Sequence, residues 1–406
     1  MTTPTPEAFA VNPTEAIEYF RQKENITTEA WTDLWEGQHA RAFVVAGANR
    51  DALVADFRQA VDRALSEGKS LGWFRQEFDR IVAAHGWSYK GSRGWRSAII
   101  FNTNLRMAYA AGRWQKIMRL ADRRPWLRYV AVMDERTRPL HRQWHDTVLR
   151  WDHPWWQTFY PPNGWNCRCT VQQLSDRDLV QMGLRVSPEP PMTPMVTRAV
   201  TTPQGRIFVD VPKGVDPGFA YNTGVAAWGQ GAEQVALEKH GKWKALTGWR
   251  PQDNLPDLPL RQPVAQRIAE PPKDEAWIRN LLRTTLGGAD AKIFIDPTGS
   301  RTAITQAIVD HWLEDESRLE GRQGYIPLIP ELITDPEEIW IGFSQSDVTG
   351  RVTLRRRYVK LVEIGDGRVI GLVCDVDGGF SSGLTFFIGR KGRAQGLRQG
   401  YLLYRK

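Results

Sequence analysis

Two histidines and two cysteines lie close enough together in the sequence to bind one metal ion. His141 and His145 are four residues apart, a spacing that places both on one face of a helix. Cys167 and Cys169 are two residues apart, and on a strand both thiols would point to the same side. Because two histidines and two cysteines form a recognised structural zinc set, these four residues are the predicted ligands.

A second interpretation, without metal, stays open at this point. The C-x-C spacing is tighter than the C-x₂₋₄-C spacing of zinc fingers. The histidines would then form hydrogen bonds within an aromatic core, and the cysteines would act as small buried side chains. A disulfide between the two cysteines is disfavoured because the loop is too short. Five tryptophans around these residues predict a small aromatic-rich module: Trp144, Trp151, Trp155, Trp156 and Trp165.

The composition is that of a soluble globular chain with two or three domains. It has 406 residues, of which 41% are hydrophobic and 25% charged. No apolar run approaches the roughly 20 residues that span a bilayer, and the first residues do not resemble a signal peptide, so no membrane partner is expected. Three cysteines cannot form a disulfide framework. The net charge of +8 permits a polyanionic partner but does not establish one.

Apolar residues recur at helical spacing over about residues 13–120. One helix is predicted to end at Gly68, a second to run from Ser70 to Gly86, and a third to run over about residues 103–120. Residues 186–257 are rich in proline and glycine and are predicted to form an extended connector with small elements.

Residues 258–406 have a different pattern, which predicts an α+β domain. Its first helix is expected to bury Ile304, Ile308 and Trp312. Good hairpin turns separate the strands that follow. The predicted strands are Glu338–Phe343, Val352–Val362, Val369–Val376 and Leu384–Ile388.

Two stretches of this region are basic and contain no acidic residue. Residues 351–360 carry five basic side chains and residues 389–406 carry six. Strand alternation puts Arg355 and Arg357 on one face and Arg356 on the other. Basic residues interleaved with tyrosines suit phosphate contact and base stacking. The alternative is a solvated sheet edge that is protected from aggregation by its charges.

The motifs around the cysteines resemble the phage Mu F-like family of minor head proteins. The pattern D-x-R-x-R-P-x-H is matched at residues 134–141, and P-P-x-G-W-N-C-R-C at residues 161–169. The resemblance covers about residues 10–225 and also includes VDPGFAYNTG. It implies a virion protein that works with the portal and other head proteins in head assembly or DNA delivery, and that passes through the host cytoplasm during assembly.

The C-terminal region resembles the phage-associated branch of barnase, EndoU, colicin and RelE-like nuclease domains. The matching pieces are DHWL, RQGYIPLIPELITDPEEIW, RRRYVKLV, LTFFI and RQGYLLY. The resemblance implies a metal-independent endoribonuclease that needs no cofactor, with RNA as its substrate and an immunity protein as a partner.

Metal-free RNA cleavage needs a base, an acid and cations that stabilise the phosphorane. The residues expected to supply these functions, or to position the phosphate, are His311, Arg357, Lys360, Thr385, Arg398 and Tyr401. The residues expected to bind nucleic acid are Arg355, Arg356, Arg390 and Lys391. No carboxylate has the sequence context of a general base.

The sequence therefore predicts three parts: a helical head-morphogenesis domain with its aromatic module (residues 1–185), the connector (186–257) and a ribonuclease-like α+β domain with an antiparallel sheet (258–406). The predicted function is that of a minor head protein carrying a ribonuclease effector. The alternative is a structural virion protein whose C-terminal region binds RNA or genomic DNA without cleaving it.

Overall fold

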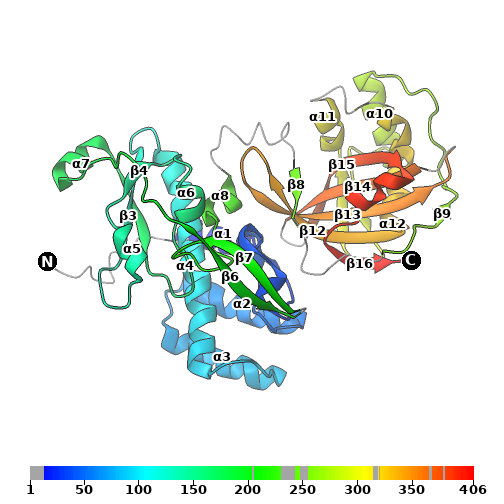
Figure 1. Ribbon diagram of the computed structural model, residues 1–406. Helices are drawn as coiled ribbons and strands as arrows, with labels where there is room; N and C mark the ends of the chain where they lie inside the picture. The colour runs from blue at the N-terminus through cyan, green and yellow to red at the C-terminus, as the bar shows by residue number, and fades with distance from the viewer. Residues whose placement is uncertain are drawn as a thin grey trace. The chain divides into compact units, whose positions relative to one another are not determined.

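The structure is a computed structural model that describes residues 13–203, 205–229, 243–246, 255–313, 319, 321–364, 368–377 and 380–406. The chain forms two compact units. The first extends to Gln234 and includes Thr349–Arg351, and the second holds the remainder. Helices dominate the first unit and an antiparallel sheet dominates the second, as the sequence predicts (Figure 1). Among the described residues, no helix is long and apolar enough to cross a membrane.

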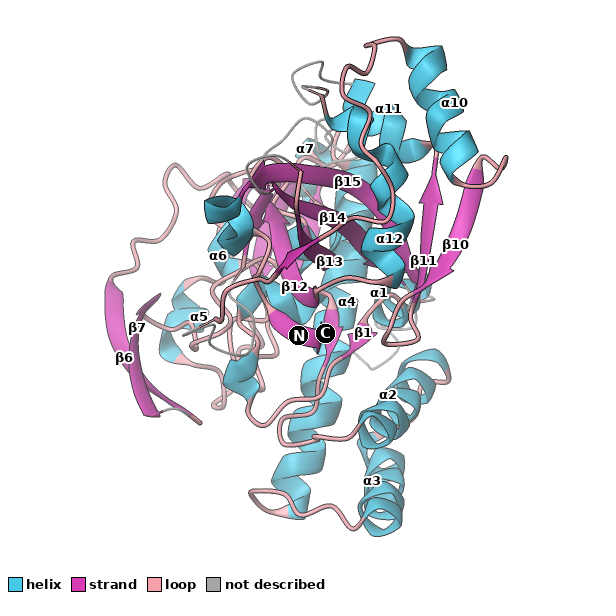
Figure 2. Ribbon diagram, turned by 90° about the vertical axis from the view of Figure 1, so that its right-hand side faces the viewer, coloured by secondary structure: helices cyan, strands magenta, loops and turns pink. Residues whose placement is uncertain are grey.

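Four helices build the main core of the first unit: α1 (Thr14–Arg21), α2 (Asp51–Ser66), α3 (Leu71–His85) and α4 (Arg93–Leu120). Helices α2 and α3 lie side by side and pack on α4 (Figure 2). Their ends follow the sequence signals, because Ser70 caps α3 and Gly86 ends it in the left-handed conformation. Helix α4 begins well before residue 103, since the Ser92 side chain accepts a hydrogen bond from the Trp95 backbone amide.

The aromatic module follows α4 and contains a three-stranded sheet in the order β4-β3-β5. Its strands are β3 (Trp126–Val130), β4 (Val148–Arg150) and β5 (Thr170–Leu174), and its helices are α5 (Pro139–Gln143), α6 (Trp156–Phe159) and α7 (Asp176–Met182). Trp144 packs against Tyr129, Trp155 and Phe159 with ring centroids 5.1–6.3 Å apart. Large aromatic side chains therefore supply the packing around the cysteine loop.

The range predicted as a connector contains regular structure that belongs to the first unit. Strands β6 (Met195–Thr202) and β7 (Gly205–Pro212) pair as an antiparallel hairpin. Helix α8 (Thr223–Trp228) follows, and the indole of Trp228 donates a hydrogen bond to the Ala111 carbonyl of α4 at 3.0 Å. The remaining short elements of this unit are β1 (Glu24–Asn25), β2 (Ala42–Phe43), η2 (Trp31–Asp33) and η3 (Glu36–Ala40).

The second unit is built on a sheet in the order β10-β11-β15-β14-β13-β12-β16, with β8 beside β12 and β9 beside β13. Two of its pairs, β11 with β15 and β9 with β13, are parallel, and the others are antiparallel. Its strands are β8 (Trp243–Ala245), β9 (Leu260–Arg261), β10 (Ala291–Ile295), β11 (Arg301–Thr305), β12 (Glu338–Ser346), β13 (Val352–Val362), β14 (Arg368–Asp377), β15 (Phe380–Arg390) and β16 (Tyr401–Arg405). The four predicted strands are thus confirmed as β12 to β15.

Helices cover one face of this sheet: α10 (Glu275–Thr285), α11 (Ala307–Leu313), α12 (Ile329–Thr334) and the 3-10 helix η5 (Arg322–Leu328). Tyr358 and Val362 of β13 point into this helical layer. Val359 and Leu361 point to the opposite face, where they meet Leu258 and the 3-10 helix η6 (Lys391–Gly396). Both faces of β13 are therefore buried.

One predicted helix differs from the structure. Ile304 lies in β11, and α11 begins only at Ala307, although Ile304, Ile308 and Trp312 all enter the same core as expected. The residues fit a helical spacing of four, but antiparallel pairing of Ile304 with Lys292 of β10 places the first of them in a strand.

Candidate functional site

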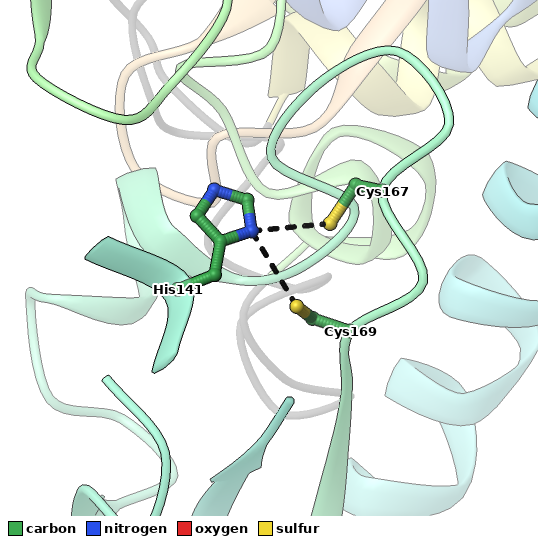
Figure 3. Close-up of side chains that lie close together, drawn as sticks. All are labelled: His141, Cys167 and Cys169. Atoms are coloured by element: carbon green, nitrogen blue, oxygen red, sulfur yellow. Dashed lines mark hydrogen bonds between the residues drawn. The ribbon is translucent and has the colours of Figure 1, made fainter. Parts of the chain in front are cut away.

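Three of the four predicted metal ligands meet in the aromatic module. His141 comes from α5, whereas Cys167 and Cys169 come from the loop between α6 and β5 (Figure 3). The imidazole Nδ1 lies 3.7 Å from Sγ of Cys167 and 3.4 Å from Sγ of Cys169. Across the described part of the chain, this is the only group of three or more histidine, cysteine or acidic side chains with its ligand atoms close together.

The fourth predicted ligand, His145, is not part of this group. Helix α5 ends at Gln143, so the expected shared helix face does not form. Nδ1 of His145 accepts a hydrogen bond from the Ala131 amide at 3.1 Å, and its Nε2 lies 3.4 Å from Asp146. Asp146 has a positive φ of 66°, which turns the chain directly after His145.

The ring of His141 is held so that its free lone pair faces the thiols. Nε2 donates a hydrogen bond to the carbonyl oxygen of Gly214 at 2.9 Å. Because a carbonyl can only accept, Nε2 carries the proton and Nδ1 is the acceptor atom. The ring also stacks on Trp144, with centroids 4.8 Å apart and planes at 21°. His141 is buried, with 1% of its surface exposed.

Charged residues of the motif fix the cysteine loop. Both guanidinium nitrogens of Arg168 bond to the carboxylate of Asp134, which holds the pKa of that carboxyl well below its usual range. Arg138 donates to Asp216 at 2.8 Å and to the Trp165 carbonyl at 3.1 Å. These contacts give most of the recognised motif a structural role around the three converging side chains.

Gly164 allows the Asp216 carboxylate to approach the loop backbone. A Cβ at position 164 would lie 2.2 Å from an oxygen of Asp216. That oxygen also accepts the Trp165 amide at 2.8 Å. Asp216 and Gly214 were not among the residues predicted from the sequence, although both belong to or adjoin the VDPGFAYNTG stretch. That stretch was the signal that could have located them.

The two thiols differ in acidity. A hydrogen bond from Cys169 lowers the pKa of Cys167 well below its ordinary value. The same bond, together with burial, raises the pKa of Cys169. Cys167 is therefore the thiol that ionises first.

In the second unit, part of the predicted nuclease set gathers on the sheet face opposite the helices. Arg355 and Arg357 project from β13 on this face. Thr385 of β15 lies across β14 in the row of Arg357. Arg357 Nη2 donates to Ser344 Oγ at 2.8 Å, and burial lowers the pKa of its guanidinium to about 10. Its buried Nη1 has no hydrogen-bond partner among the described residues.

A second buried polar group without a partner among the described residues is Oγ1 of Thr353. Strand alternation puts Thr353 on the same face as Arg355 and Arg357. Arg355 is bonded to Asp375 at 2.9 Å and stacks over the Trp243 ring at 3.9 Å. On this face Arg355 is therefore neutralised, whereas Arg357 retains an N–H group that can donate a further hydrogen bond.

Three other predicted cations form ion pairs within the protein. Lys360 Nζ bonds to Glu331 Oε1 at 2.7 Å and to Asp335 Oδ2 at 2.9 Å. Arg398 forms a two-point ion pair with Glu338, with both distances 2.7 Å. On the helical face, Arg356 bonds to Asp296, also at 2.9 Å. Buried pairs of this kind orient side chains and leave little charge for a ligand.

The remaining predicted residues do not join the group around Arg357. His311 lies on α11, in the helical layer, and Arg357 points to the opposite side of the sheet. Tyr401 lies on β16. The side chains of Arg390 and Lys391 fall outside the described part of the structure. Of the predicted residues whose side chains the structure describes, only Arg355, Arg357 and Thr385 are brought together.

Comparison with known proteins divides the chain in the same way as its fold. Residues 55–172 match the family described as Phage Mu protein F like protein. Residues 276–405 match the family described as phage-Barnase-EndoU-ColicinE5/D-RelE like nuclease2. Both resemblances predicted from the sequence are therefore confirmed. No solved structure matches the chain.

Two curated proteins resemble the chain over about half its length. The "Putative capsid assembly protein F" of Escherichia phage Mu is 39% identical over 254 residues, which cover 56% of this chain and 57% of that protein. The Mu-like prophage FluMu F protein of Haemophilus influenzae is 34% identical over 226 residues, covering 50% of this chain and 54% of that protein. The chain thus spans about half the length of these relatives.

Proposed function

Because the chain joins a phage Mu protein F-like region to a phage-associated nuclease-like region, we propose that it is a minor head protein that carries a ribonuclease effector. The presence of both matches in one chain is the observation that carries the proposal. The first unit acts in capsid assembly in the host cytoplasm and enters the virion beside the portal, in contact with other head proteins. The name of the phage Mu relative supports the assembly role.

The second unit cleaves RNA without a metal ion and is held inactive by an immunity protein. The buried Nη1 of Arg357 supports a phosphate site on the face of β13 opposite the helices, because a buried guanidinium nitrogen without a partner is costly until an anion satisfies it. The hydroxyl of Thr353 is a further donor on that face. Arg355 is neutralised by Asp375, so it positions the neighbouring side chains of β13 and does not bind the phosphate itself.

A second candidate function is nucleic-acid binding without cleavage, within a structural virion protein. Lys360 and Arg398, two of the expected catalytic cations, are already ion-paired within the protein, and this favours the second function. The position of His311 in the helical layer also favours it, because a general acid and a phosphate-binding cation must reach the same phosphodiester.

Cleavage of a fluorescent RNA oligonucleotide by the purified full chain, in the presence of EDTA, separates the two functions. We expect cleavage by the unmodified protein and a loss of about 100-fold or more in Arg357→Met, since a buried cation at a developing negative charge contributes on this scale. Methionine retains much of the arginine volume. Arg283→Ala, which removes an exposed ion pair with Asp290, is the matched control and should keep full activity.

RNA binding without cleavage, together with normal growth of cells producing the protein, would establish the second candidate function instead. His311→Ala in the same assay assigns the proton-transfer role. A loss as large as that of Arg357→Met would place the role on His311, and full activity would place it on another group.

A further inference from the structure

We propose that His141, Cys167 and Cys169 bind one zinc ion through Nδ1 and two thiolates, with the fourth position taken by water. This site lies in the first unit and is independent of the proposed nuclease activity. It differs from the set expected from the sequence, because His145 is excluded.

The distances between the three side chains fit zinc. A tetrahedral zinc ion with bonds of about 2.0–2.1 Å to nitrogen and about 2.3 Å to sulfur separates nitrogen from sulfur by about 3.5 Å. The two observed separations, 3.4 and 3.7 Å, lie on either side of this value. All three ligand atoms lie within 4.8 Å of one another, which accommodates the sulfur–sulfur separation of about 3.8 Å in such a site.

The surroundings of His141 match those of a metal-binding histidine. Such a histidine usually donates its second ring N–H to a carbonyl or carboxylate, which fixes the tautomer and the ring orientation. Here the Gly214 carbonyl has this role at 2.9 Å, and stacking on Trp144 fixes the plane of the ring. The ring is therefore oriented before any ion binds.

Nδ1 has a single lone pair and accepts one good S–H hydrogen bond at a time, so without metal one thiol bonds to the ring and the other bonds to its neighbouring thiol. A zinc ion engages the nitrogen and both sulfurs together, and each thiol loses its proton on binding. The thiolate and imidazole set suits zinc rather than magnesium or calcium, which prefer oxygen ligands.

Binding of zinc would join segments that are far apart in the sequence. His141 follows the D-x-R-x-R motif, the cysteines end the P-P-x-G-W-N motif, and the Gly214 carbonyl comes from the loop after β7. An ion bound by these residues would hold the cysteine loop against α5, in a module with little regular secondary structure.

Metal analysis of the purified full chain and two single variants tests the site. We expect about one equivalent of zinc in the unmodified protein and in His145→Ala, and loss of most of it in His141→Ala. His145→Ala is the matched control, because His145 lies four residues away, is also a histidine and completes the set predicted from spacing alone. Equal zinc loss in the two histidine variants would overturn the three-residue site.

If His141→Ala does not fold, the absorption spectrum of the unmodified protein with bound cobalt tests whether the two thiolates bind a metal ion. Two thiolates in a tetrahedral site give intense visible d–d bands and a thiolate charge-transfer band. Their appearance at one equivalent of Co²⁺, and their loss on adding Zn²⁺, are the expected results. A weak octahedral spectrum, a Cys167–Cys169 disulfide, or stoichiometric copper or iron in place of zinc would overturn the proposal.

Discussion

At the scale of single residues, buried bases give the first unit a pH-dependent stability. Lys23 is 5% exposed and borders a cavity of about 370 Å³ lined mostly by apolar side chains. Burial, with smaller contributions from Arg58 and Arg41, lowers the pKa of its amine to about 7. The unfolded chain returns it to about 10.4.

Replacement of Lys23 by methionine tests this burial. Between about pH 7 and 10 the unfolded chain holds a proton on Lys23 that the folded chain lacks, so the free energy of unfolding rises with pH across this window. Lys23→Met removes the dependence, and it should raise the free energy of unfolding by about 4 kcal/mol at pH 7 and by less than about 1 kcal/mol at pH 10. Calorimetry at a series of pH values measures both, and parallel curves for the two proteins would contradict the assignment.

The cysteine loop shows what sequence spacing can and cannot establish about a site. Local spacing selected His141, Cys167 and Cys169, which the structure brings together, because short chelating intervals bring side chains close in most local conformations. It also selected His145, which the structure keeps apart from the other three, because the helix that would carry both histidines ends at Gln143. The Gly214 carbonyl carries no side-chain signal at all, and only the fold brings it to the ring.

At the scale of elements, close contact between α1 and α4 depends on Gly112. A Cβ at this position would lie 2.6 Å from the backbone nitrogen of Ala16 in α1. Gly112→Ala should therefore destabilise the first unit by about 1–3 kcal/mol, although alanine favours helix over glycine by about 1 kcal/mol. Thermal unfolding measures the difference.

Gly94 in the same helix is the matched control for this substitution. Nothing lies within 4 Å of a Cβ added there, so Gly94→Ala should leave stability unchanged or raise it by up to about 1 kcal/mol. An equal effect of the two substitutions would show that helix propensity, and not the approach of α1, determines the outcome.

Sequence patterns located elements well where pairing is local. Strands β12 to β15 follow one another through short turns, and alternation with turn residues was sufficient to predict them. Strand β11 is an exception: it pairs with β10 through a short turn, but Ile304, Ile308 and Trp312 also fit a helical spacing, and that spacing led to its assignment to a helix. Strand β16 pairs with β12, which lies far from it in the sequence, and no pattern predicted it.

At the scale of the whole molecule, the start of the second unit differs between the sequence prediction and the structure. Composition suggested residue 258, whereas the compact unit begins at Val235. Three contacts from the intervening segment support the earlier start: β8 pairs with β12, Trp243 lies under Arg355, and the Pro256 carbonyl accepts a hydrogen bond from Arg398 at 2.7 Å.

Two fragments of the second unit, 235–406 and 258–406, therefore differ in stability. The shorter fragment lacks three contacts: β8 no longer pairs with β12, Trp243 no longer stacks on Arg355, and Arg398 loses the Pro256 carbonyl. Their loss together should lower the free energy of unfolding by about 2–3 kcal/mol. For a fragment of this size the melting temperature should fall by about 4–12 °C. Trp243→Ala in the longer fragment should reproduce only part of this fall. Equal melting temperatures for the two fragments would show that the unit begins at residue 258, as composition alone suggests.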